Sequence, residues 1–171
     1  MTENTETTEV VTATRTIPAS AAQIFAVLAD PGAHASIDGT GWVREPLDTA
    51  PLTEVGQLFR MAMYHNARAI GDYRVVNQVH TFDRPRTIAW LTGTERPDGT
   101  LELGGWLWRY DLTPLGPAET AVTLTYDWSA VPAHIRARGI TFPPFGPEHL
   151  DNSLHHLTAL AVSSRSFAHR N

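Results

Sequence analysis

The chain has 171 residues, of which 42% are hydrophobic and 18% charged, and its formal net charge at pH 7 is −5. This balance is typical of one soluble globular domain over residues 1–171, and the negative charge argues against a nucleic-acid partner. The sequence contains no lysine and no cysteine. A lysine Schiff base, a lysine general base, disulfide bonds, thiolate metal sites and a cysteine nucleophile are therefore excluded.

The first predicted elements are a strand and a short helix. Apolar and polar residues alternate over Val10–Ile17, which favours a strand. Ser20 and Gln23 have the spacing of a capping box, so a helix is expected to begin at this point. Ala33–Ile37 is expected to add one more helical turn, and a second strand is expected at Trp42–Glu45.

A succession of strands then fills the middle of the chain, with turn residues such as the Arg96–Gly99 stretch between them. Alternation is clearest in the last two strands, where every second residue is aromatic or aliphatic. The expected strands are Gln57–His65, Asp72–Phe82, Thr87–Thr94, Glu102–Leu112 and Thr120–Ser129.

The C-terminal part of the chain changes character. Residues 131–146 combine prolines, glycines and aromatic residues, a composition that predicts an ordered flap with one helical turn at Ala133–Arg138. A long amphipathic helix is expected from Pro147, as its first residue, to about Ala168. Its inner stripe is predicted to consist of Leu150, Leu154, Leu157, Ala161 and Ser164, flanked by Leu160 and Phe167.

The remaining segments predict a cytoplasmic protein. Residues 1–9 carry three glutamates and no apolar run, so they are expected to form a disordered tail and not a signal peptide. No stretch approaches the roughly 18 apolar residues that a membrane span requires.

The order of these elements predicts an α+β fold. An amphipathic helix must bury its apolar stripe, and the sheet built by the preceding strands is the only large partner available to it. A curved antiparallel sheet that grips one helix often leaves a cavity between them, and such cavities hold small molecules.

Several stretches resemble one known superfamily. Residues Ala13–Pro31 resemble the opening of SRPBCC proteins, which are START-like and birch-pollen-allergen-like and include the polyketide cyclase/dehydrase and lipid-transport group. Gly56–Met61, Asn77–Val79, Ile88–Trp90 and Tyr126–Trp128 resemble the actinobacterial branch of that group. The resemblance implies a helix-grip fold, in which a seven-stranded curved antiparallel sheet wraps around the C-terminal helix and two short helices lie between the first two strands. Members of this superfamily include lipid carriers, hormone receptors and aromatase/cyclases.

The alternation within the strands predicts which side chains face the cavity. Four tryptophans would offer stacking surfaces to a flat, ring-shaped ligand, although aromatic residues also fill cores. The expected ligand-binding residues are Phe59, Met61, Met63, Asn77, Trp90, Trp106, Trp108, Trp128, Phe142 and Leu157.

Polar residues on the same faces of the strands predict the chemistry. His65 is the candidate acid or base, because imidazole exchanges a proton near neutral pH. Tyr110 and Tyr126 are the candidates for orienting a ligand carbonyl. The alternative is that these residues and Asn77 form an internally satisfied His–Tyr–Asn set. His134 and His149 flank the flap and would lie at the mouth of the cavity.

Neither a metal nor a cofactor is expected. His149 and His156 share one side of the last helix, but no third ligand is evident. The leading hypothesis is a protein, monomeric or homodimeric, that binds a hydrophobic, polycyclic or polyketide-like molecule in its cavity. If the protein is an enzyme, the reaction that these residues favour is a cofactor-free cyclisation or dehydration. The alternatives are a non-catalytic carrier or sensor of a lipid or aromatic molecule, and an interaction module without a cavity.

Overall fold

The computed structural model describes residues 8–66 and 70–168, with side chains as far as residue 163. Within this part, seven strands form one antiparallel sheet in the order β1-β7-β6-β5-β4-β3-β2. The strands are β1 (Val10–Ile17), β2 (Val43–Pro46), β3 (Leu58–His65), β4 (Gly71–Asp83), β5 (Thr87–Glu95), β6 (Leu101–Gly116) and β7 (Glu119–Asp127). The helices are α1 (Ala21–Leu28), a 3-10 turn (Pro31–Ala33), α2 (His34–Ile37), α3 (Ala133–Arg136) and α4 (His149–Ala168).

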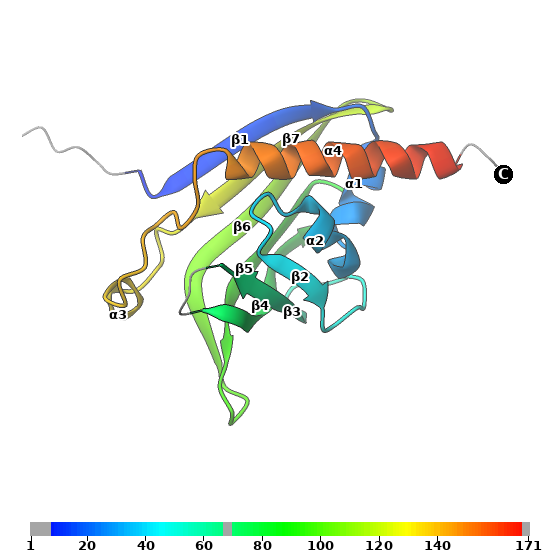
Figure 1. Cartoon of the computed structure of the whole chain (residues 1–171). Helices are drawn as coiled ribbons and strands as arrows, with labels where there is room; N and C mark the ends of the chain where they lie inside the picture. The colour runs from blue at the N-terminus through cyan, green and yellow to red at the C-terminus, as the bar shows by residue number, and fades with distance from the viewer. Residues whose placement is uncertain (1–7, 67–69, 169–171) are drawn as a thin grey trace, which may run out of the picture.

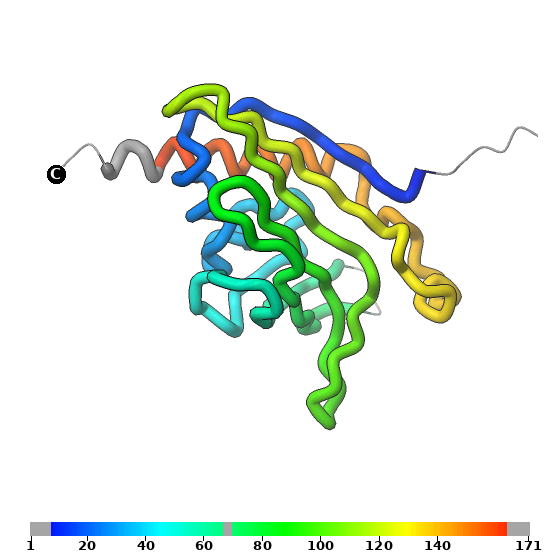
Figure 2. Tube along the Cα trace, turned by 180° about the vertical axis from the view of Figure 1, so that it is seen from behind, coloured from blue at the N-terminus to red at the C-terminus, as the bar shows by residue number. Residues whose placement is uncertain are grey.

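The sheet is bent by irregularities in its long central strands. The register shifts between Val79 and Thr81 where β4 meets β5, and between Leu91 and Gly93 where β5 meets β6. Bulges of this kind bend the strand that carries them and increase its twist. Figure 2 shows β1, β7 and β6 running side by side and the β5–β6 hairpin extending beyond the rest of the sheet.

Helix α4 lies along only part of this sheet (Figure 1). Its main contacts are with β1, β7, α1 and α2. The apolar residues that the described part of the helix buries have helical spacing: Leu150, Leu154, Leu157 and Ala161. This arrangement confirms the helix-grip fold, and the main contacts of α4 do not include β3, β4, β5 or β6.

Local signals account for the first helix. The Ser20 hydroxyl accepts a hydrogen bond from the Gln23 backbone N–H at 3.2 Å, and the Gln23 side chain accepts one from the Ser20 N–H. This confirms the expected capping box. The apolar residues of the helix, among them Ile24, Phe25 and Leu28, are fully buried in the core.

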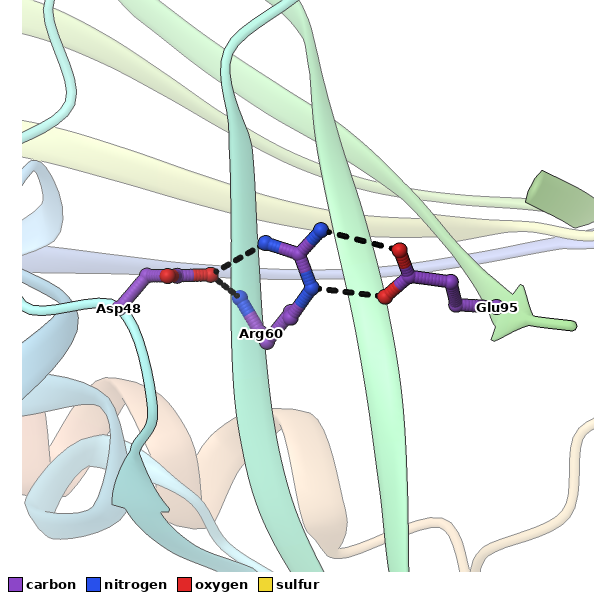
Figure 3. A network of polar contacts seen from close by, with 3 residues as sticks. All are labelled: Asp48, Arg60 and Glu95. Atoms are coloured by element: carbon purple, nitrogen blue, oxygen red, sulfur yellow. Dashed lines mark hydrogen bonds and ion pairs between the residues drawn. The ribbon is translucent and has the colours of Figure 1, made fainter. Parts of the chain in front are cut away.

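An ion-pair network holds the outer face of the sheet near β3 (Figure 3). Arg60 on β3 bonds to Asp48, which follows β2, and to Glu95 at the end of β5. The Asp48 carboxylate also accepts a hydrogen bond from the Arg60 backbone N–H at 2.8 Å. All three side chains are about one-third exposed, so the network orients the edge of the sheet more than it stabilises the fold.

Some predicted boundaries were wrong. Strand β6 runs on to Gly116, four residues beyond the expected end, because it stays paired with β7. Helix α4 begins at His149, so Pro147 lies before the helix. Glu9, expected in a disordered tail, accepts a bond from the Trp128 N–H and pairs with Arg136. The expected stripe residues Ser164 and Phe167 lie outside the described side chains.

One glycine permits the close approach of α4 to the loop after α2. A Cβ atom at Gly39 would lie 2.5 Å from the His149 carbonyl oxygen and 2.9 Å from its Nδ1. We therefore expect Gly39→Ala to destabilise the protein by about 1–3 kcal/mol, as overpacking against backbone does. Chemical denaturation would measure the loss, with Gly116→Ala as the control because no atom lies within 4 Å of its added Cβ. Equal stability of the two variants would contradict this prediction.

Candidate functional site

A cavity of about 420 Å³ lies between the inner face of the sheet, α2, the 131–146 segment and the start of α4. This volume is in the usual range for small-molecule sites. Most of the lining is apolar or aromatic, with polar groups at a few positions. The lining includes Met61, Met63, His65, Tyr73, Val75, Asn77, Trp90, Thr92, Trp106, Trp108, Tyr110 and Tyr126 from the strands, and His34, Asp38, Trp42, Phe142, Phe145, His149 and Ser153 from elsewhere.

Aromatic side chains on β5, β6 and β7 form one wall of this cavity. The Trp90 and Tyr110 rings lie 6.0 Å apart, and the Trp108 and Tyr126 rings lie 4.5 Å apart. They share one face of the sheet because Trp90 pairs with Trp108, which pairs with Tyr126. Tilted rings at these separations attract one another and form a surface against which a flat ligand would pack.

The 131–146 segment covers the wall from the other side. Phe142 contacts the Trp106 ring at 6.0 Å, and Phe145 contacts the Trp108 ring at 5.6 Å. Arg136 anchors the base of the segment, because its guanidinium donates to the carbonyl oxygens of Val131 and Trp128. The segment therefore places two phenyl rings over the cavity.

An amide and a hydroxyl form a polar pair on the sheet. The Thr92 hydroxyl donates to Oδ1 of Asn77 at 2.7 Å, and both side chains are buried. Since the amide oxygen is engaged, the NH₂ group of Asn77 is the part of this pair that can donate to a ligand.

The loop after α2 brings a carboxylate to the cavity. Asp38 accepts hydrogen bonds from the backbone N–H groups of Thr40 and Val43 at 3.1 and 3.0 Å. The Thr40 hydroxyl donates to both carboxylate oxygens at 2.9 Å. On the other side of the loop, the Gly39 N–H donates to the Ser153 hydroxyl of α4 at 3.1 Å. The carboxylate therefore has a fixed position.

Two buried tyrosines retain their protons. Burial raises the pKa of the Tyr110 hydroxyl, and the negative charge of Asp38 raises it further. Burial alone raises the pKa of Tyr126. Both hydroxyls therefore remain hydrogen-bond donors at neutral and alkaline pH, the form that would bind a ligand carbonyl.

His34, the first residue of α2, is a neutral base at the cavity wall. Its Nε2 lies 2.8 Å from the Leu28 carbonyl oxygen, which can only accept, so Nε2 carries the proton and Nδ1 has a free lone pair. The ring stacks on Trp90 at 5.0 Å and is almost fully buried. Burial lowers the pKa of His34, although the bond to Leu28 and the charge of Asp30 oppose this effect.

His149, the first residue of α4, is also buried at the cavity. Its ring contacts Phe145 at 4.5 Å and Trp108 at 5.5 Å. Within the described part of the chain, Nδ1 of His149 is the buried side-chain nitrogen or oxygen that lacks a hydrogen-bond partner. Burial lowers the pKa of His149 against the opposing charges of Asp38 and Glu148.

These two imidazoles predict how stability depends on pH. Both have a lower pKa in the folded protein than the ordinary value of 6.5, so the unfolded chain binds more protons as the pH falls. Their contribution is fully present above pH 6.5 and is lost as the pH falls through the lowered folded values. We expect the midpoint temperature of thermal unfolding to decrease as the pH is lowered from 7.5 to 5, a range around the ordinary histidine pKa of roughly 6.5.

Variants test the assignment of this pH dependence. His149→Leu removes one buried imidazole and should flatten the dependence of the unfolding midpoint on pH. His155→Leu, on the exposed side of α4, should leave it as in the wild type. A flat profile in the wild type, or identical profiles in both variants, would contradict the prediction.

The family is identified by comparison with known proteins. A family model described as polyketide cyclase/dehydrase and lipid transport matches residues 8–161. The chain belongs to this family. The protein Rv0088 of Mycobacterium tuberculosis strain H37Rv is 30% identical over 118 residues, which are 68% of this chain and 46% of that protein. The chain thus spans less than half the length of this curated relative.

Solved structures share the fold at low sequence identity. Protein Ms6760 from Mycobacterium smegmatis aligns with a TM-score of 0.65 and 16% identity, over 92% of this chain and 93% of that one. The AHSA1 protein from Silicibacter pomeroyi aligns with a TM-score of 0.59 and 16% identity, over 91% and 99%. The mycobacterial relatives agree with the actinobacterial resemblance. The family description names lipid transport and polyketide chemistry, so this is a fold that handles hydrophobic ligands.

The structure brings most of the expected residues of this family member to one cavity. The three candidates for chemistry, His65, Tyr110 and Tyr126, all line it. His65 lies at the end of β3, with its ring 4.6 Å from that of Trp42. The expected binding residues that also line it are Met61, Met63, Asn77, Trp90, Trp106, Trp108 and Phe142.

Three expected binding residues lie outside the cavity lining. Phe59 is buried behind it, where its ring contacts those of His34 and Trp90 edge-on. Trp128 packs with Val131 and other residues at the base of the 131–146 segment. Leu157 is completely buried in the core between α4 and the rest of the protein. All three side chains are buried among core residues and not in the cavity lining.

Sequence reasoning also missed part of the site. His34 and Asp38 lie on the short helix and loop after α1, and Ser153 lies on α4. His149 was placed only at the mouth, whereas it is buried. The sequence feature that could have pointed to His34 and Asp38 is their position in and directly after a predicted short helix. Within the described residues, no group of three His, Cys, Asp or Glu could hold a metal, and no helix is long and apolar enough to span a membrane.

Proposed function

We propose that this chain binds a hydrophobic, polycyclic or polyketide-like molecule in the cavity between the sheet and α4. The observation that carries the proposal is the cavity of about 420 Å³, with an aromatic wall and few polar groups. A cavity of this composition favours ligands with large apolar surfaces and a small number of hydrogen-bonding positions. Family membership supports the same ligand class.

The polar groups support cofactor-free cyclisation or dehydration of such a ligand. A neutral histidine takes the proton next to a ligand carbonyl, and a protonated tyrosine stabilises the resulting enolate by donating to its oxygen. Tyr110 and Tyr126 are the proposed donors. His65 is one proposed base, and the buried His34, with its free Nδ1, is a second. The cavity would fold the ligand so that the new carbon–carbon bond forms within it.

A carrier or sensor is the second candidate, and a specific observation favours it. Several polar groups of the cavity already have partners in the protein: His34 bonds to Leu28, Asp38 to Thr40, and Asn77 to Thr92. Groups satisfied in this way fix the shape of a binding site without moving protons.

Binding of the neutral dye N-phenyl-1-naphthylamine tests the shared part of both candidates. We expect saturable binding of one dye per chain, with the blue shift typical of an apolar site. Native mass spectrometry of the purified protein should also reveal a co-purified apolar molecule. If the folded protein binds no dye and carries no such molecule, the proposed function is wrong.

His65→Ala, His65→Phe and Tyr110→Phe then separate an enzyme from a carrier. A carrier should keep its affinity for the co-purified molecule in these variants. An enzyme should keep binding but no longer convert the molecule during incubation, as mass spectrometry would show.

A further inference from the structure

The charge inside the cavity has one sign. Among the described lining residues there is a carboxylate, Asp38, and no arginine. The sequence contains no lysine, so arginine is the only permanently cationic side chain in this protein. A ligand in the cavity therefore lies near a fixed negative charge. No described lining residue carries a fixed positive charge.

The Asp38 carboxylate is held in one position at the cavity. Hydrogen bonds from the Thr40 hydroxyl and from the N–H groups of Thr40 and Val43 prevent the Asp38 side chain from turning away. The charge is also felt across the cavity, since it contributes to the raised pKa values of Tyr73 on β4 and Tyr110 on β6. Tyr73 and Tyr110 line the cavity from separate strands.

Two of the three histidines that line the cavity, His34 and His149, do not compensate for the carboxylate. Burial lowers the pKa of both His34 and His149, so both rings are neutral at neutral pH. Described arginines next to lining residues lie outside the cavity. Arg109 bonds to Asp111, and Arg60, beside Met61, bonds to Asp48 and Glu95. Arg44 lies over the ring of the exposed Tyr64, and Arg74 is an exposed side chain between two lining residues of β4.

We propose that the cavity takes an uncharged aromatic or polycyclic ligand and rejects ligands that carry a carboxylate, sulfonate or phosphate. This selectivity rests on the proposed function, because it presupposes that the cavity binds a ligand. Its physical basis is the cost of bringing a second anion beside a carboxylate in a water-poor space where no described lining residue is a permanent cation that could pair with it. Free fatty acids and acyl phosphates are therefore excluded, whereas neutral phenols, ketones and polycyclic alcohols fit.

Two dyes with the same ring skeleton test this selectivity. N-phenyl-1-naphthylamine is neutral, and 8-anilinonaphthalene-1-sulfonate adds one sulfonate to the same anilinonaphthalene. We expect the wild type to bind the neutral dye at least about tenfold more tightly in fluorescence titrations at neutral pH. The neutral dye is also more apolar, which by itself favours its binding. The decisive quantity is therefore how the ratio of the two dissociation constants, sulfonate dye over neutral dye, changes in variants.

Two variants alter the charge of the cavity. Asp38→Asn removes the carboxylate, and Met63→Arg adds a guanidinium to the lining without touching the hydrogen bonds of Asp38. The second variant keeps the test valid if the first unfolds the loop. We expect each to narrow the ratio of the two dissociation constants by about fivefold or more, chiefly by tighter binding of the sulfonate.

Matched controls change the net charge outside the cavity. Glu45→Gln on β2 and Tyr64→Arg on β3 alter exposed side chains and should change the ratio by less than about twofold. The proposal is overturned if the wild type binds both dyes equally, or if the folded variants at Asp38 and Met63 keep the wild-type ratio. Failure of the neutral dye to bind at all would instead overturn the proposed function, and this selectivity with it.

Discussion

Met63→Trp is expected to weaken binding of N-phenyl-1-naphthylamine by more than about tenfold. Met63 lines the cavity from β3 and is only partly buried, so the larger indole would extend into the open space. A cavity of about 420 Å³ has little room for both an extra indole and a polycyclic ligand. The fold should survive, because the added group fills a void and does not enter the packed core.

Tyr64→Trp is the matched control for this variant. Tyr64 is the next residue of the same strand, lies on the opposite face and is 37% exposed. The control should bind the dye as the wild type does. Dye binding that persists unchanged in a folded Met63→Trp protein would show that the ligand site lies elsewhere.

Leu157→Ala is expected to lower the free energy of unfolding by about 2–5 kcal/mol. Leu157 is fully buried and belongs to the cluster in which α4 packs on α1 and the sheet. Truncation removes buried methyl groups and leaves a space that the surrounding side chains cannot fill completely. Chemical denaturation at neutral pH would measure the loss.

Val162→Ala on the same helix is the control, because Val162 is 38% exposed and should cost far less. The comparison also tests where Leu157 belongs. A residue of the cavity wall would change dye affinity more than stability, whereas a core residue should change stability first. Comparable stability of the two variants would contradict the position of Leu157 in the core.

Local patterns were sufficient to predict the elements and their order. Alternation predicted the face on which Trp108 and Tyr126 lie, because successive side chains of a strand point to opposite faces whatever the rest of the fold does. The Ser20 capping box marked the start of α1 for an equally local reason. The ends of elements were less accurate, since β6 continues to Gly116 only because β7 pairs with it.

The candidate site was predictable only as a set of inward-facing residues. Alternation assigns Phe59 and Met61 to the same face of β3, and both face inward. Only Met61 lines the cavity, because His34 and Trp90 pack against Phe59 and occupy the space in front of it. Period-two spacing contains no information about depth, which depends on the neighbouring elements.

The sequence by itself determined the α+β order of elements, the inner face of each long strand and the absence of lysine and cysteine chemistry, all of which follow from local spacing and composition. The helix-grip architecture was implied by the resemblance to a known superfamily. Tertiary structure alone decided that Asp38, His34 and His149 meet at the cavity and that Leu157 does not. The physical reason is that the curvature of the sheet and the docking of α4 along β1 set the distances between segments remote in the chain.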